Sequence, residues 1–331
     1  MPTKLFDRNE LKTCPLSKRI SKIHISSMIH PNTKPKQLDE KTRKDVEIIA
    51  HAVRKAKNNR SPIILATGAH LIKNGGSRIL IELMNQAYIS HIIMNSAGSI
   101  HDWELAYQGM TAEDVKEYIT AGQFGIWEET GKFINLAINS GAKNNLGYGV
   151  SIGKMILEDK VRDQYGKVIE VKHGYPEVSL QAQAYKLNIL LGVLASIGQD
   201  IIYCSPYNDG AAIGATSLND FLSFANTVRN LEHGVYLSIG SSIMSPMAFE
   251  KALSMARNTN KERKPKEFLI VANDIQPKLT MWEKGEPPIA NPEYYNRIFK
   301  TFSRMGGDFK YVELDNIDFI HNLYTLLKQD I

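Results

Sequence analysis

Two short loops of the sequence carry small and polar residues of the kind that hold a nucleotide phosphate. Small residues let a ligand approach the backbone, and the helix start beyond such a loop offers free N–H groups and a positive dipole end. An acid close by could accept hydrogen bonds from ribose hydroxyls. The residues in question are Thr67, Gly68 and His70 in the first loop, and Ser96, Ala97, Gly98, Ser99 and Asp102 in the second.

A simpler interpretation of these loops remains open. Residues 97–99 could form only a tight turn between a strand and a helix, and Asp102 could be an ordinary acid of a helix's first turn. The G-x-G-x-x-G fingerprint of many dinucleotide sites is absent from the sequence. The pattern by itself therefore favours neither interpretation.

The segments around the two loops predict a strand–helix–strand unit. Residues 63–66 form a brief apolar run that stops at a glycine, which predicts a buried strand, and residues 92–94 predict a second one. Between them, residues 79–87 repeat apolar side chains with the spacing of an amphipathic helix. Both loops then lie at the carboxyl ends of parallel strands, where open α/β sheets bind ligands.

Two later loops could join the same site. The apolar run 201–204 predicts a third strand, and Asp209 a few residues beyond it is the best site carboxylate after Asp102, unless it only forms an Asp-Gly turn. Gly240 and Ser241 follow a strand predicted over 235–239, where a phosphate could lie, although this loop could also serve packing alone.

Charged residues in two further segments offer chemistry of other kinds. Lys284 stands near Trp282, and a lysine against an aromatic wall can lose its proton by desolvation and attack a carbonyl or imine carbon; most loop lysines, however, face solvent. Glu128 and Glu129 could hold a cation or a ribose, but acids in the first turn of a helix usually interact with its dipole. The histidines have no metal-binding spacing, so no metal site is predicted.

The order of elements predicts an α/β fold with a doubly wound, mostly parallel, Rossmann-like sheet. Residues 1–38 are lysine-rich and punctuated by prolines, which predicts an extended basic arm, and residues 39–331 predict a single α/β nucleotide-binding domain with a helical insertion at about 111–160. The insertion begins with a predicted helix start at Thr111, which has an acid three places on. Helices are expected over 113–120, 128–139, 148–158, 177–196, 217–231, 246–257, 293–304 and 316–328, and further strands over 267–272 and 309–313.

Composition limits the classes of partner. The chain has 331 residues, 43% hydrophobic, and a net charge of +5, with basic residues dense over 4–44 and 261–266. Neither basic segment is interleaved with aromatic residues, so no nucleic-acid groove is expected. Cys14 and Cys204 are isolated, which fits a reducing cytoplasm, and no apolar run approaches the roughly 20 residues of a membrane span. We expect no signal peptide and a cytoplasmic protein.

The chain resembles the deoxyhypusine synthase family in several short segments that occur in the family's order. The family's Thr-Ser-Asn-Leu-Ile turn is similar to residues 67–72, and its Thr-Ala-Gly-Gly turn with two following acids is similar to 96–102, with the first acid on His101 and the second on Asp102. Its Cys-Pro-Ala-Leu-Thr-Asp-Gly run, triple glycine and Trp-Gly-Lys segment are similar to 204–210, 240–242 and 282–284.

This resemblance implies an NAD-dependent transferase that moves an aminobutyl-type group from a polyamine to an amine acceptor through a lysine imine, in a homotetramer with cofactor sites between subunits. It implies Lys284 as the imine former and a small-molecule amine as substrate. Where the family has a lysine and a histidine after its triple glycine, this chain has Ser245 and Pro246. A non-catalytic NAD- or nucleotide-binding protein on the same scaffold is therefore the alternative hypothesis, and a plain dehydrogenase is a third. The residues that the resemblance assigns to the cofactor are Thr67, Gly68, His70, Ser96, Ala97, Gly98, Ser99, Asp102, Asp209, Gly240 and Ser241.

Overall fold

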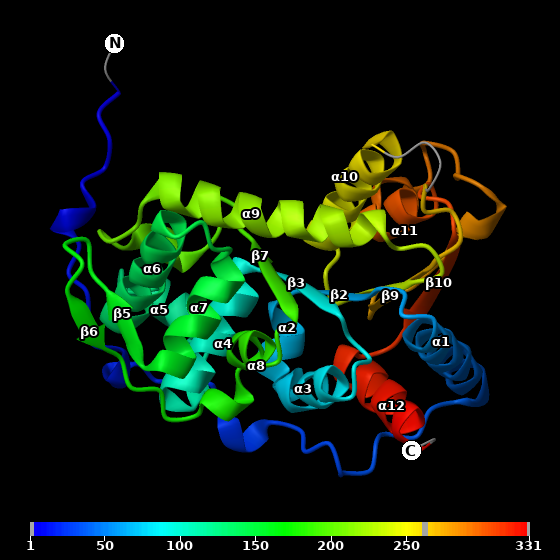
Figure 1. The fold of residues 1–331 in the computed structure, drawn as a ribbon, viewed down its shortest axis with the longest axis horizontal. Helices are drawn as coiled ribbons and strands as arrows, with labels where there is room; N and C mark the ends of the chain where they lie inside the picture. The colour runs from blue at the N-terminus through cyan, green and yellow to red at the C-terminus, as the bar shows by residue number, and fades with distance from the viewer. Residues whose placement is uncertain (1–2, 260–263, 330–331) are drawn as a thin grey trace.

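A six-stranded, fully parallel sheet forms the centre of the molecule (Figure 1). A computed structural model of the chain describes residues 3–259 and 264–329, so residues 261–263 of the second basic segment lie outside the described residues. The sheet order is β10-β9-β8-β2-β3-β7, which is 6-5-4-1-2-3 when these strands are numbered along the chain, the order of the Rossmann fold. The strands are β2 (Ile63–Thr67), β3 (His91–Asn95), β7 (Leu190–Leu194), β8 (Val235–Ile239), β9 (Leu269–Asp274) and β10 (Asp308–Glu313).

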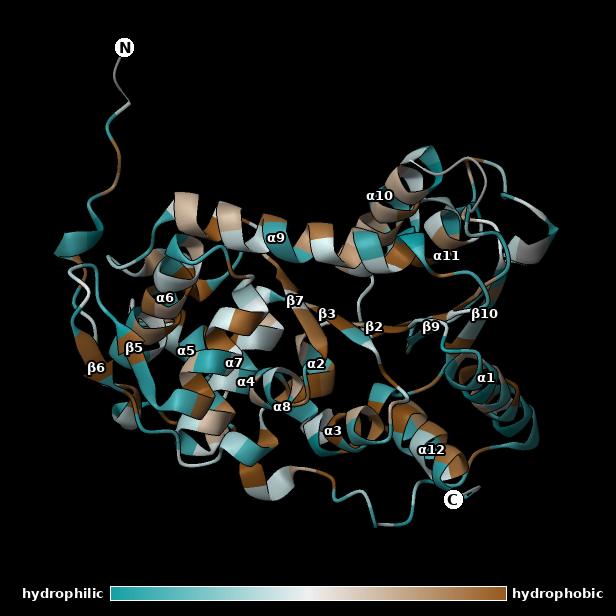
Figure 2. Cartoon of the chain, in the orientation of Figure 1, coloured by the Kyte–Doolittle hydropathy of each residue, from teal (hydrophilic) through white to brown (hydrophobic). Residues whose placement is uncertain are grey.

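Successive strand residues enter two separate hydrophobic clusters, one on each face of the sheet. In β2, Ile63 and Leu65 belong to one cluster, and Ile64 and Ala66 belong to the other. Side chains of a strand alternate between faces, so a sheet that is covered on both sides needs strands that are apolar throughout. This explains the apolar run at 63–66 and the mainly apolar strand at 235–239, in which Ser238 is the exception. Figure 2 shows β2 in brown at the centre of the molecule.

Helices cover both faces and extend beyond one edge of the sheet. In Figure 1, α9, α10 and α11 lie on one face, and α1, α3, α8 and α12 lie on the other. The longer helices are α1 (Glu40–Asn58), α3 (Ser77–Asn85), α4 (Ser96–Gln108), α6 (Glu128–Lys143), α7 (Tyr148–Glu158), α9 (Gly210–Arg229), α10 (Met244–Thr259) and α12 (Asn316–Lys328). The shorter ones are α2 (Ala69–Leu71), α5 (Val115–Thr120), α8 (Leu180–Lys186) and α11 (Arg297–Phe302).

The segment before α1 lies along the rest of the chain and is held there by specific contacts. Strand β1 (Ile23–His24) pairs antiparallel with β4 (Met110–Thr111), and Cys14 forms a β-bridge with Trp127. The Thr13 hydroxyl donates to Glu128, and the Leu16 amide donates to Glu129. The two acids therefore bind this segment, which argues against the alternative that they hold a cation or a ribose.

The third strand of the sheet is β7, and the prediction of a strand over 201–204 was wrong. Residues Ile201–Cys204 form a 3-10 turn, and the expected helix over 177–196 divides into α8 and β7. The division falls at Asn188, whose φ of 55° ends the helix; asparagine tolerates this left-handed conformation better than most residues.

The predicted helix start at Thr111 was also wrong. The helix there is α5, and its N-cap is Asp114, which accepts a hydrogen bond from the Glu117 amide. Thr111 lies in β4 instead. Asp39, by contrast, caps α1 as the sequence predicts, by accepting from the Thr42 amide. Among the described residues, no helix is both long enough and apolar enough to cross a bilayer.

Candidate functional site

The loops after β2 and β8 meet at the carboxyl edge of the sheet, where its strand order reverses. A Cβ atom at Gly68 would lie 2.5 Å from the carbonyl oxygen of Gly240, so only glycine fits at this contact. Thr67 is buried and its hydroxyl donates to the Gly68 carbonyl, while the Ser241 hydroxyl accepts from the Ser245 amide. The structure thus brings Gly68 and Gly240 together at the position where doubly wound folds bind their ligands.

A cavity of about 230 Å³ lies beside this edge. Lys73, from the π-helical turn Ile72–Gly76 after β2, contributes to its wall, as does the start of α4 through Ala97 and His101. Asp200 comes from the loop after β7. Further lining residues are Arg19, Ile100, Glu104, Ala112, Glu113, Val115, Phe124, Gln199 and Ile201.

A chain of hydrogen bonds joins His101 to a buried ion pair. The guanidinium of Arg19 donates to both carboxylate oxygens of Glu104 at 2.7 Å, and both side chains are 1% exposed. The Thr111 hydroxyl donates to Glu104 Oε2 at 2.6 Å, and the Thr130 hydroxyl donates to Oε1 at 2.8 Å. His101 Nδ1 lies 2.7 Å from the Thr111 hydroxyl oxygen. The Glu104 carboxylate is therefore saturated by donors.

This chain of bonds fixes the proton on His101. Burial would raise the pKa of Glu104, but the attraction and hydrogen bonds of Arg19 outweigh it and hold the pKa below its usual range. Because Thr111 gives its one hydroxyl hydrogen to Glu104, its oxygen must accept a hydrogen from His101 Nδ1. Burial lowers the pKa of His101 to about 4, so the ring is neutral and Nε2 carries a free lone pair.

Three buried hydroxyl groups gather near the start of α4: Ser96 Oγ, Tyr148 Oη and Tyr203 Oη. Ser96 interacts with Asp200 and Tyr203, and Tyr148 interacts with Ser99, but none of these contacts has full hydrogen-bond geometry. All three residues lie close to Asp200. Burial raises the pKa of Asp200, and the contact with Ser96 opposes this rise. Burial and the charge of Asp200 raise the pKa of Tyr203 to about 12, so the phenol remains a donor. The start of α4 therefore carries a cluster of hydroxyl groups around one carboxyl group.

Asp102 has a structural role that the sequence did not predict. The side chain is buried at 1% exposure, and its carboxylate accepts hydrogen bonds from the amides of Leu180 and Gln181 and from the side chains of Ser179 and Gln181. Oδ2 accepts three of these hydrogen bonds and Oδ1 accepts the fourth, and the side chain is too deeply buried to meet a ribose. The Asp102 carboxylate therefore connects α4 to the start of α8, and its position does not support the expected contact with a ribose.

Two other residues that the sequence predicts for the site, Asp209 and Lys284, do not line the cavity. Asp209 is exposed and caps α9 by accepting from the amides of Ala211 and Ala212; because residues 201–204 are not a strand, it does not follow a strand end. Lys284 is exposed in the 3-10 turn Trp282–Lys284. Trp282 is buried and stacks on Phe299, so the aromatic ring faces the core and does not desolvate the lysine.

The remaining predicted residues lie in or beside the edge of the sheet. Ala97 lines the cavity, Gly98 lies in the first turn of α4 and donates its amide to Asn95, and the Ser99 hydroxyl donates to Gln181. His70 is exposed after β2; burial lowers its pKa, and so does the charge of Lys73.

Sequence reasoning missed the groups that contribute most to the cavity. The signal for His101 and Glu104 was their spacing of three residues in one helix, which places both side chains on the same face. The signal for Asp200 was its position after β7, which the incorrect helix prediction concealed. Arg19 and Lys73 left no signal, because basic residues are common in the surrounding sequence.

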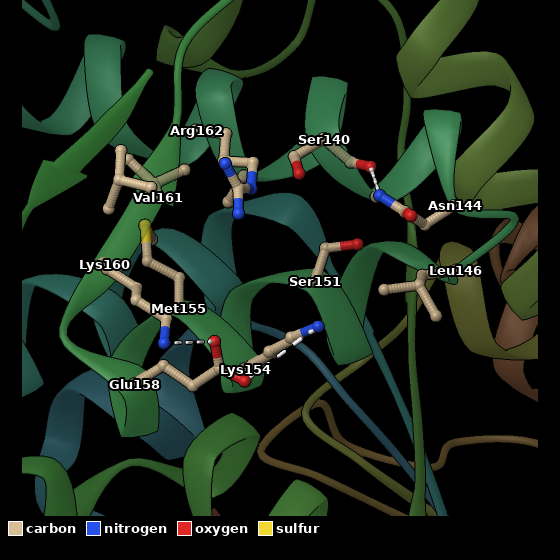
Figure 3. Close-up of a pocket in the computed structure, with 13 residues that line it drawn as sticks. Ser140, Asn144, Leu146, Ser151, Lys154, Met155, Glu158, Lys160, Val161 and Arg162 are labelled. Carbon is tan, nitrogen blue, oxygen red and sulfur yellow. Dashed lines mark hydrogen bonds and ion pairs between the residues drawn. The ribbon is translucent and has the colours of Figure 1, made fainter. Parts of the chain in front are cut away.

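A second cavity, of about 290 Å³, lies between α6, α7 and β5 (Lys160–Arg162). Figure 3 shows its charged rim, where Glu158 forms ion pairs with Lys154 at 3.9 Å and Lys160 at 3.5 Å. The rest of the wall includes apolar side chains such as Met155, and no residue predicted for the site lines it. The candidate site is therefore the smaller cavity at the sheet edge.

Comparison with known proteins establishes the fold. No family model matches the sequence, and no curated protein matches it. Unliganded AgrE matches at 17% identity and a TM-score of 0.53, over 90% of this chain and 34% of AgrE, so the chain spans about a third of that protein. A protein assigned to the LOR/SDH group, from Methanococcus maripaludis S2, matches at 16% identity and a TM-score of 0.52, over 91% of this chain and 74% of its own.

A protein assigned as a deoxyhypusine synthase, from Entamoeba histolytica, matches at 9% identity and a TM-score of 0.46, over 84% of this chain and 85% of its own. A TM-score this low supports no conclusion about the family or function of this chain. The chain is thus a Rossmann-like α/β protein with a cavity at the carboxyl edge of its sheet, whose wall is mainly apolar and carries several charged side chains. Membership of the deoxyhypusine synthase family stays a prediction.

Proposed function

We propose that this chain binds NAD at the carboxyl edge of its sheet and uses it to oxidise a small amine held in the adjoining cavity. The observation that carries the proposal is the cluster of three buried hydroxyls, Ser96, Tyr148 and Tyr203, which surrounds Asp200 beside the start of α4. Hydroxyl donors and a helix start suit the phosphates and riboses of a dinucleotide. The strand order and the glycine contact between residues 68 and 240 add support, because this edge is where doubly wound folds bind dinucleotides.

The residues around the edge fit the cofactor in their chemistry. Ser96, Tyr148 and Tyr203 would hold it, together with the backbone at Gly68. The G-x-G-x-x-G fingerprint is absent, so side-chain hydroxyls take the place of some backbone contacts. When bound, NAD would supply a hydride acceptor, which no side chain can replace.

The cavity favours a cationic substrate of small size. Burial raises the pKa of Asp200, and it raises the pKa of Glu113 as well. A carboxyl group in this condition is stabilised as an anion when a cation binds beside it. A volume of about 230 Å³ suits a small molecule, and a protonated amine would pair with Asp200. Glu113, which already accepts from the Gly125 amide and the Trp127 ring, would add a second negative charge.

The aminobutyl transfer that the sequence resemblance implies begins with the same oxidation but also needs a lysine at the oxidised carbon. Lys284 is exposed and beside a ring that faces the core, whereas Lys73 lines the cavity. We therefore propose amine oxidation without an imine on Lys284. The alternative, a protein that binds NAD without catalysis, differs in that no amine would reduce the bound cofactor.

Calorimetric titration with NAD tests the proposal directly. Tyr203→Phe removes one hydroxyl and should weaken NAD binding about tenfold, because a lost hydrogen bond of about 1–1.5 kcal/mol corresponds to that factor. Tyr185→Phe is the matched control, since Tyr185 is a half-exposed tyrosine of α8. Equal affinities for the two variants, or no binding of NAD by the parent chain, would reject the proposed site.

A further inference from the structure

His101 presents an unusual combination of a fixed proton and a free nitrogen. Its Nδ1 is committed to Thr111, and no described residue forms a hydrogen bond with Nε2. His101 lines the cavity, so Nε2 is the nitrogen left for a bound molecule. A buried, neutral imidazole that is oriented by a second group and has one free nitrogen has the geometry of a general base.

We propose that His101 is the acid–base residue of this site, that it accepts a proton from the substrate at Nε2, and that Thr111 and Glu104 hold it in the reactive tautomer. The inference rests on the proposed function, because it assigns the proton transfer that amine oxidation requires. Arg19 completes the assembly by neutralising Glu104.

The proton and electron balance of the step is simple. A substrate ammonium of the type R₂CH–NH₃⁺ gives one proton to His101 Nε2, which leaves the neutral amine with a free lone pair. The C–H electron pair then leaves as hydride to the cofactor while the lone pair forms the C=N bond, so the product is R₂C=NH₂⁺. The imidazolium afterwards releases its proton to water. Without the first transfer, the ammonium has no lone pair to form the new bond.

Glu104 makes this proton transfer more favourable without receiving the proton. As Nε2 becomes protonated, the ring acquires a positive charge, and the Nδ1–Thr111–Glu104 connection places a carboxylate behind it. The neighbouring charges act in opposite directions: Glu104 raises the pKa of His101, whereas Lys73, Arg19 and His70 lower it. Burial, and to a smaller extent these positive neighbours, make the imidazolium less stable than a free one, so it releases its proton to solvent.

The structure offers clear alternatives for the role of Thr111. If Thr111 only fills space, Thr111→Val should leave the state of His101 unchanged, because valine has nearly the same shape. If the hydroxyl orients the ring, Thr111→Val should release the tautomer and Thr111→Ser should restore it. These variants leave Arg19 and Thr130 on Glu104, so the ion pair is kept.

Imidazole nitrogen NMR on the full chain, labelled with ¹⁵N at its histidines, tests the proposal without a substrate. The chain has 9 histidines, and His101→Gln identifies the signal of interest. We expect a neutral ring with the proton on Nδ1 from about pH 8 down to about pH 5, because burial lowers the pKa of His101 to about 4. Thr111→Val should give mixed tautomers, and Thr111→Ser should return the parent spectrum.

Two results would overturn the proposal: a proton on Nε2 or a cationic ring at about pH 7, or an unchanged tautomer in Thr111→Val. A second readout follows NADH formation with small primary amines. Any turnover should fall by about 10²–10⁴-fold in His101→Gln at unchanged NAD affinity, and full turnover in that variant would also overturn the proposal. Failure of NAD to bind would reject the proposed function instead, because the nitrogen spectra are recorded without cofactor.

Discussion

Replacing Arg19 with methionine should destabilise the chain strongly, because it leaves Glu104 charged and buried. In the parent chain the two groups form a two-pronged ion pair at 2.7 Å, with both side chains 1% exposed. Thr111 and Thr130 still donate to Glu104 in the variant, but neither carries a charge. Removing one partner of a buried ion pair typically costs about 3–5 kcal/mol of unfolding free energy, which is much more than a surface pair would cost.

The pH dependence of this loss has a definite sign. In the parent chain the pKa of Glu104 is lowered, so its contribution to stability is present above the ordinary glutamate pKa and is lost as the pH falls through the folded-state value. Without Arg19, burial dominates and the pKa of Glu104 rises. The deficit of Arg19→Met should therefore be largest at about pH 8 and should shrink as acid protonates Glu104.

Urea denaturation at about pH 8 and about pH 5 measures both effects. Adding Glu104→Gln to Arg19→Met removes the uncompensated charge and should recover a large part of the lost free energy. Lys22→Met is the matched control, since Lys22 lies in the same segment but its ion pair with Asp114 is more than a third exposed on both sides. A loss below about 1 kcal/mol in Arg19→Met, or one that grows in acid, would refute the reasoning.

Three further predictions concern other parts of the fold. Gly68→Ala should lower the unfolding free energy by about 1–3 kcal/mol, because the new Cβ would lie 2.5 Å from the Gly240 carbonyl oxygen. Gly214→Ala, in open space within α9, should raise the unfolding free energy by about 0.5–1 kcal/mol. Equal melting temperatures of the two variants would contradict the contact between Gly68 and Gly240. Burial raises the pKa of Asp220 from 3.8 to about 7, so ionising it costs stability increasingly between those values. Asp220→Asn should therefore flatten the decline in unfolding free energy from about pH 4 to 7, and parallel curves would show that Asp220 is not responsible. Asp102→Ala should lower the unfolding free energy by about 1–3 kcal/mol and leave NAD affinity within about twofold, because the Asp102 carboxylate binds the start of α8. A loss of NAD affinity without a loss of stability would show that Asp102 binds the cofactor.

Much of the sheet could be predicted from the sequence because its strands are apolar on both faces. The runs at 63–66 and 235–239 coincide with β2 and β8, and Asp39 caps α1 as expected. Strand β7 was missed for a physical reason: an apolar strand that follows a helix after only a short turn continues the apolar pattern, and periodicity cannot separate the two.

The site was less predictable because its connections span long distances in the sequence. Arg19 and Glu104 are 85 residues apart, and the Asp102 contacts with α8 span 77–79 residues. A single sequence shows the charge of Asp102 but does not show whether its oxygens are already occupied. The loops after β2, β3 and β8 were placed correctly at the sheet edge, since their position follows from the strands alone.

Hydrogen–deuterium exchange with and without NAD tests the central claim, that the carboxyl edge of the sheet holds the cofactor, most directly. NAD should slow amide exchange at residues 67–76 and 95–101, which carry Gly68, Lys73 and the start of α4. The segment 140–162 around the second cavity should exchange at an unchanged rate. Protection confined to 140–162, or no protection in either segment at saturating NAD, would contradict the account.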